Sequence, residues 1–192
     1  MILHSNSIRF IRMKQKLLVL AGAFIMILLV VVSIQQYQLY QTKQYSPEAT
    51  IQFVSEDVRI DVSYSRPYKN GRVIFGDLVP YGRWWRTGAN EPTTITLNRD
   101  IIFNESDLLQ AGTYSIVTIP YEDYWRLIFS SSVPDWGTNY DASENKLETT
   151  MQVKELPQTI EQFIIDFTEN DKSAELIMAW DKTKASIPFK VL

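Results

Sequence analysis

Residues 58–64 read VRIDVSY, and their apolar side chains fall on every second position. Val58, Ile60, Val62 and Tyr64 would therefore share one face of a strand, while the polar residues between them share the other. This period of two is typical of a half-buried β-strand. The stretch predicts a strand with one face in a core and the other in water.

The same period recurs further along the chain. It appears in residues 147–153, 163–167, 176–180 and 185–191. Turn-forming residues separate these segments, so the pattern predicts nine or ten short strands. We predict an all-β fold, an antiparallel two-sheet β-sandwich, for residues 47–192.

Two central segments carry apolar residues on both faces. They are residues 114–119 (YSIVTI) and 125–129 (WRLIF), joined by a short acidic connection that begins at Pro120. Strands covered on both sides show this composition. We therefore predict a central hairpin with Trp125 in the core.

Upstream of the predicted β-domain lies an uncharged run, residues 17–34 (LLVLAGAFIMILLVVVSI). As a helix it spans roughly 27 Å, close to the hydrocarbon thickness of a bilayer. Basic residues precede it, and by the positive-inside rule they hold the N-terminus in the cytoplasm. These are Arg9, Arg12, Lys14 and Lys16.

The predicted organisation therefore has four parts. Residues 1–16 are a cytoplasmic basic tail, 17–34 a transmembrane signal anchor in the lipid bilayer, 35–46 a juxtamembrane stalk, and 47–192 an extracytoplasmic domain. We expect a single-pass protein of the bacterial cell membrane, with its domain periplasmic or surface-exposed. The alternative is a cleaved signal peptide with Val31 and Ser33 at the cleavage site, but the run is longer than usual and lacks an A-x-A site.

Composition excludes several chemistries. The chain has no cysteine, and its one histidine, His4, lies in the basic tail. Thiol chemistry, disulfides and histidine-based catalysis or zinc binding in the domain are therefore excluded. Asp135, Asn139, Asp141 and Glu144 match no calcium-loop spacing, so we expect no metal and no cofactor.

Charge also argues against one class of partner. Once the four basic residues of the tail are set apart, the rest of the chain has 15 basic and 22 acidic residues, a net charge of −7. Phosphate backbones repel such a protein. We expect no nucleic acid partner.

The candidate ligand site centres on residues 81–91, YGRWWRTGANE. Tryptophan faces stack on sugars or other flat groups, while arginine, asparagine and glutamate bind hydroxyls and anions. The site would take a small polar ligand or a glycan. Its candidate residues are Arg66, Arg72, Trp84, Trp85, Arg86, Asn90 and Glu91. The structural alternative is that Trp85 closes the end of the sandwich while Arg86 and Asn90 hold the loop backbone.

Arg66 has the same parity as Tyr64, so its guanidinium is expected at the core side or rim of the fold. A buried charge needs a partner. We expect that partner to be Glu91, unless Arg66 is presented to an anionic ligand.

Three functions compatible with these features remain. The first is a non-catalytic ligand-binding or interaction module, and the second is a structural envelope protein. The third is a carboxylate-dependent saccharide hydrolase, for which the candidate acids are Asp61, Asp77, Glu91, Glu122 and Asp123.

A string of motifs resembles the bacterial domain-of-unknown-function family DUF2911. It comprises residues 64–67 (YSRP), 71–76 (GRVIFG), 78–82 (LVPYG), 85–91 (WRTGANE), 111–115 (AGTYS) and 118–120 (TIP), followed by 135–137 (DWG) and 180–181 (WD). The resemblance implies an exported or surface-associated β-sandwich protein with no agreed activity and no catalytic residues to carry over. Trp84 and the long anchor depart from the family pattern.

Overall fold

The computed structural model describes residues 2–134, 136–170 and 173–192, with side chains from Met13 onward except at residues 170 and 173. The side chains of His4, Arg9 and Arg12 in the predicted tail therefore lie outside the described part of the chain. So does Asp135. The chain forms two compact units, Met1–Gln44 and Tyr45–Leu192.

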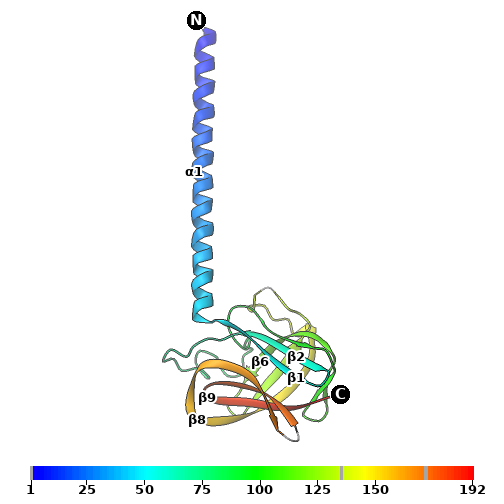
Figure 1. Cartoon of the computed structure of the whole chain (residues 1–192). Coiled ribbons are helices and arrows are strands. Elements are labelled where there is room, and N and C mark those ends of the chain that lie inside the picture. Colours follow the sequence, from blue (N-terminus) through cyan, green and yellow to red (C-terminus); the bar gives the residue numbers. More distant parts are fainter. Residues whose placement is uncertain (1, 135, 171–172) are drawn as a thin grey trace. The chain divides into compact units, whose positions relative to one another are not determined.

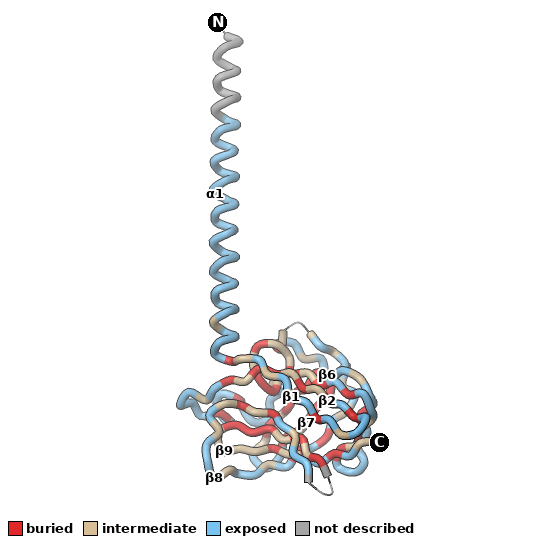
Figure 2. The backbone as a smooth tube through the Cα atoms, in the orientation of Figure 1, coloured by how far each residue is buried: buried red, intermediate tan, exposed pale blue. Residues whose placement is uncertain are grey.

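The first unit is part of one long helix, α1 (Ile2–Tyr45). The helix continues through the predicted stalk and ends just before Ser46-Pro47, because the residue that precedes a proline disfavours the helical conformation. Its apolar side chains are exposed, and Leu18 for example is 73% exposed (Figure 2). Among the described residues, this is the one helix long and apolar enough to cross a membrane.

Ser33 is the polar exception within the apolar run of α1. Its hydroxyl donates to the carbonyl oxygen of Leu29 at 2.8 Å. This bond satisfies the hydroxyl within the helix itself, as an apolar surrounding requires.

The second unit is built from strands. The described residues form β1 (Glu48–Ser55), β2 (Val58–Ser65), β3 (Thr93–Leu97), β4 (Ile101–Phe103), β5 (Asp107–Leu109), β6 (Gly112–Pro120), β7 (Tyr124–Ser130), the short 3-10 helix η1 (Ala142–Glu144), β8 (Asn145–Asn170) and β9 (Ser173–Val191). The all-β antiparallel prediction is confirmed. The prediction of two separate sheets is refined. Hydrogen bonds join the described strands into one sheet in the order β1-β2-β3-β6-β7-β8-β9-β4-β5.

The predicted central hairpin is β6 and β7, which pair from Ser115–Ser130 to Pro120–Trp125. Both faces are covered, since the neighbouring residues Leu127 and Ile128 are both buried. Trp125 is 0% exposed, which confirms its predicted place in the core.

The C-terminal segments differ from the prediction of short strands. They form two long strands, β8 and β9, which curve side by side across the domain (Figure 1). Their pairing is interrupted between Glu155 and Ile160, where Pro157 has no N–H to donate. On β9, Asp181 opposite Ile160 has a positive φ of 54°. The paired strands therefore bend at this point.

The bend lets the sheet fold back on itself around a core, so that the second half of β8 approaches the end of β2 although the two strands are not neighbours in the sheet. The first half of β8 pairs with β7, while Phe163 in the second half donates its N–H to the carbonyl of Pro67, just beyond β2. Rings from distant strands meet inside. Tyr64 lies 5.8 Å from Phe163, and Phe53 lies 5.6 Å from Phe167.

Candidate functional site

The connection between β2 and β3, residues 66–92, carries the predicted site. Its backbone is tied to two separate strands: Lys69 donates to Glu161 on β8 at 2.7 Å, and Trp85 exchanges backbone hydrogen bonds with Thr118 on β6 at 2.7 and 3.0 Å. A long connection held at both ends in this way has a defined position on the sheet. Its side chains are therefore presented in fixed places.

Trp85 is the centre of an aromatic cluster. Its ring lies 5.0 Å from Phe163, 6.1 Å from Trp125 and 6.0 Å from Trp180, the last nearly parallel at 19°. Its indole Nε1 donates to the carbonyl of Gly88 at 3.0 Å. Trp85 is only partly buried, so it both packs on the core and reaches the surface.

The residues that follow Trp85 form a rigid turn. Thr87 and Asn90 have positive φ angles of 56° and 57°. Such conformations persist only when the surroundings hold them. Thr93 Oγ1 donates to the Thr87 carbonyl at 2.8 Å, and Asn90, which is 6% exposed, donates through Nδ2 to the Ser46 carbonyl at 3.3 Å.

Beside this turn lies a cavity of about 460 Å³, which we call the tryptophan cleft. Four of the seven predicted site residues line it, namely Arg72, Trp85, Arg86 and Asn90. Its volume is within the range of small-molecule sites. An open cleft therefore lies beside Arg86 and Asn90, which under the structural alternative only hold the loop backbone in place.

Arg86 has little to balance its charge. Its guanidinium donates through Nη1 to the Asn90 carbonyl at 3.3 Å, and it forms no ion pair with any described residue. Burial lowers the pKa of Arg86 from its ordinary value, because partial removal from water disfavours the charged form. Its side chain also packs over Gly137, where an added Cβ would lie 2.9 Å from Arg86 Cδ.

Arg72 is exposed but held in place by carbonyl groups. Its Nε donates to the Lys69 carbonyl at 2.9 Å, and its Nη2 donates to the Tyr68 carbonyl. Lys69 itself pairs with Asp181 at 2.8 Å. Asp181 is thus paired with lysine rather than with arginine.

The other three predicted residues do not line the tryptophan cleft. Glu91 lines a separate cavity of about 250 Å³ with Glu48 and Ser63. Arg66 is half-buried and donates through Nε to the Phe163 carbonyl at 3.4 Å. Its predicted ion pair with Glu91 stays a prediction.

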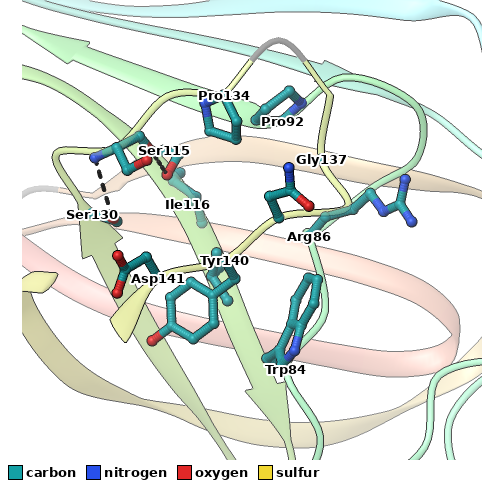
Figure 3. A pocket seen from close by; sticks show the side chains of 13 residues that line it. Trp84, Arg86, Pro92, Ser115, Ile116, Ser130, Pro134, Gly137, Tyr140 and Asp141 are labelled. Atoms are coloured by element: carbon teal, nitrogen blue, oxygen red, sulfur yellow. Dashed lines mark hydrogen bonds between the residues drawn. The ribbon is translucent and has the colours of Figure 1, made fainter. Parts of the chain in front are cut away.

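Trp84 faces another way, toward the small cavity drawn in Figure 3. Its ring lies 5.6 Å from that of Tyr140. This cavity has a volume of about 10 Å³, close to the space that one water molecule needs. Figure 3 shows the guanidinium of Arg86 directed away from Tyr140 and Asp141, so Arg86 reaches from the wall of the small cavity toward the tryptophan cleft.

Sequence reasoning missed several residues of the tryptophan cleft. Trp180, Asn70, Leu78 and Val79 also line it. The period of two places Trp180 on the inward face of its strand, but does not show that this inward position opens onto a cleft. Asn70 belongs to a recognisable turn, and only tertiary structure brings that turn to Trp180.

The described carboxylates suggest no metal centre. No group of three or more His, Cys, Asp and Glu side chains within the described residues is placed to hold an ion. Asp141 instead accepts from the Ser143 N–H at 2.9 Å, and Glu144 accepts from the Ser131 hydroxyl at 2.7 Å. Of the candidate catalytic acids, Asp61 pairs with Arg59 at 2.8 Å. The hydrolase hypothesis stays a prediction.

Comparison with known protein families gives one match, over residues 46–189, to the family described as "Protein of unknown function (DUF2911)". The matched range covers more than half of the chain and contains the quoted motifs through residue 181. The predicted resemblance is confirmed. No curated protein and no solved structure matches the chain.

Proposed function

We propose a function for this chain, which belongs to the DUF2911 family of proteins of unknown function. It is a membrane-anchored binding module that takes a small ligand in the tryptophan cleft. The observation that carries this proposal is the cleft of about 460 Å³ between the turn at Trp85 and the strand that carries Trp180. Ligand sites are typically concave, apolar in their walls and supplied with a few placed polar groups. The cleft is concave, part of its wall is apolar, and Arg72, Arg86 and Asn90 supply polar groups.

The constrained backbone of the loop also supports a binding function. Thr87, a β-branched residue with a φ of 56°, holds a strained backbone conformation. Strain of about 1–3 kcal/mol for each such residue is usual at functional sites, where it keeps a site preorganised. The arginines and Trp85 are thus positioned before any ligand arrives.

The proposed location rests on α1. Its uncharged run is long enough to span a bilayer, and the basic residues before it favour a cytoplasmic N-terminus. The β-domain then lies outside the bacterial cytoplasm, periplasmic or on the surface, where it meets ligands from the envelope or the medium.

Ligand-dependent stabilisation tests the binding function. The full chain, kept in a neutral polyoxyethylene detergent, is heated in the presence of glycans, organic acids and phosphate esters. We expect one of these classes to raise the Tm, because a ligand that binds only the folded state stabilises it.

Ala89→Phe is the site variant, since Ala89 lines the cleft and a larger side chain would fill it. We expect this variant to lose the rise in Tm. Ala142→Phe, at an exposed position in η1, is the matched control and should keep it. If Ala89→Phe still binds the ligand, the site lies outside the tryptophan cleft. If no class of compound raises the Tm, the proposal is contradicted.

A structural envelope role is the second candidate, because Arg86 and Asn90 both donate to backbone carbonyls. Under this role, Asn90→Ala lowers the free energy of unfolding by about 1–3 kcal/mol, the usual effect of losing a buried hydrogen bond, and no ligand changes the Tm. Urea denaturation together with the ligand screen separates the two roles.

A further inference from the structure

The tryptophan cleft has an unusual charge for this domain. Two arginines, Arg72 and Arg86, line it, and none of its described lining residues is Asp or Glu. The chain beyond the basic tail nevertheless has 22 acidic residues against 15 basic ones. A local concentration of positive charge in an acidic protein attracts anions to that place.

Two carboxylates contact residues of the 66–92 connection, and one of them is neutralised by an ion pair. Asp181 pairs with Lys69 at 2.8 Å, and the Glu161 side chain accepts from the Asn70 N–H at 2.8 Å. Arg72 and Arg86 donate only to carbonyl groups and form no ion pair with any described residue. A guanidinium has five N–H donors, so both arginines keep donors for a ligand.

Part of the wall of the cleft is apolar. Trp85 and Trp180 lie nearly parallel at 6.0 Å, and Leu78 and Val79 line the same cavity. Both indole N–H groups are occupied, by the Gly88 carbonyl at 3.0 Å and the Glu161 carbonyl at 3.4 Å. Trp180 is buried at 1% exposure and supports Trp85 from behind, so Trp85 is the ring that a ligand can reach.

We infer that the tryptophan cleft binds an organic anion, with its carboxylate or phosphate at Arg72 and Arg86 and its apolar part against Trp85. Arginine suits this role because its planar donors match both anions in a forked geometry. The inference rests on the proposed binding function and names its ligand class. A lipid phosphate group and a free phosphate ester share this chemistry.

Matched probe pairs test the charge requirement in the full chain. Benzoate is compared with neutral benzamide, and phenyl phosphate with neutral phenyl glucoside, by tryptophan fluorescence titration and Tm. We expect binding of an anion and at least about tenfold weaker binding of its neutral partner, because the charge-assisted bonds are lost. Added salt should weaken the anion's binding.

Single arginine variants locate the anion. Arg72→Gln and Arg86→Gln should each weaken anion binding about tenfold or more. Arg83→Gln is the matched control, because Arg83 is exposed in the same connection, does not line the cleft, and loses the same charge. If Arg86→Gln lowers the Tm of the free protein, Arg72→Gln, whose residue is exposed, still tests the inference.

The outcomes separate the two proposals. If phenyl glucoside binds as tightly as phenyl phosphate and Ala89→Phe abolishes that binding, the binding function stands. The inference that the ligand is an anion is then overturned. If neither arginine variant changes anion binding, the anion inference is also overturned. If no probe and no screened class binds, both the anion inference and the proposed binding function are overturned. A rise in Tm with dihexanoyl phosphatidylglycerol but not with phenyl phosphate would support the anion inference. It would identify a lipid head group as the source of the anion.

Discussion

Tyr64 connects β2 to β8, two strands that are not neighbours in the sheet. Its hydroxyl donates to the Ile165 carbonyl at 3.1 Å and accepts from the Ile165 N–H at 3.0 Å, while its ring is buried against Phe163. One side chain at the end of β2 thus satisfies two backbone groups of β8. Burial raises the pKa of Tyr64 above its ordinary value, because the phenolate form loses hydration.

The pH dependence of stability follows from that shift. A raised folded-state pKa contributes stability that is present below the unfolded pKa of about 10 and is lost as pH rises through the folded value. We expect the urea midpoint to fall above about pH 10, and to fall less steeply in Tyr64→Phe. Tyr124→Phe, at an exposed position, should keep the steeper decline. Identical alkaline slopes in Tyr64→Phe and the parent chain would contradict this.

At the scale of elements, the 66–92 connection depends on close backbone approach. Gly88 lies against the end of β2 and the start of β3: an added Cβ would be 2.9 Å from the Ser65 carbonyl oxygen and 3.1 Å from Thr93 Oγ1. A backbone carbonyl in a strand has no room to retreat. Gly71, in the same connection, has nothing within 4 Å of that position.

This contrast predicts the effects of two alanine substitutions. Gly88→Ala should lower the free energy of unfolding by about 2–3 kcal/mol through overpacking. Gly71 has a positive φ of 71°, but there is open space around the position of an added Cβ. For Gly71→Ala we therefore expect only the backbone cost of about 1 kcal/mol. Urea denaturation measures both. Equal losses would mean that the turn does not press on β2.

Whether a segment forms one strand or two is also decided at this scale. The alternation in residues 147–153 and 163–167 is correct for each segment, yet both belong to β8. The intervening Pro157 interrupts the ladder without ending the strand, because β9 bends with β8 at Asp181. Local periodicity does not contain this information.

For the whole molecule, the core belongs to the β-unit alone. Every described buried hydrophobic residue lies between Phe53 and Phe189, while the apolar side chains of α1 are exposed. A helix with that surface is stable in lipid rather than in water. Anchoring is therefore the expectation for the intact chain.

Membrane fractionation tests the anchor. We expect the chain at its full mass of 22.3 kDa in the membrane fraction after alkaline carbonate extraction. Leu28→Arg, within the apolar run, should reduce insertion, since arginine at the centre of a helix costs about 2.5–3.5 kcal/mol. Leu39→Arg, beyond the run, is the control and should be tolerated. A shorter soluble product would instead indicate a cleaved signal peptide.

The sequence by itself determined the features that depend on local pattern. An uncharged run specifies a long apolar helix, a period of two specifies strands, and apolar residues on both parities specify the covered hairpin of β6 and β7, because each depends only on neighbours along the chain. Composition likewise excluded histidine and thiol chemistry from the domain.

Only the tertiary structure decided which candidate residues meet. Arg72, Trp85, Arg86 and Asn90 share a cleft with Trp180, whereas Arg66, Trp84 and Glu91, as close in sequence, lie elsewhere. The reason is physical: backbone hydrogen bonds fix the connection against β6 and β8, and the bend of β8 and β9 brings a residue some ninety positions away to the same wall. Neither effect has a signature in the spacing of residues.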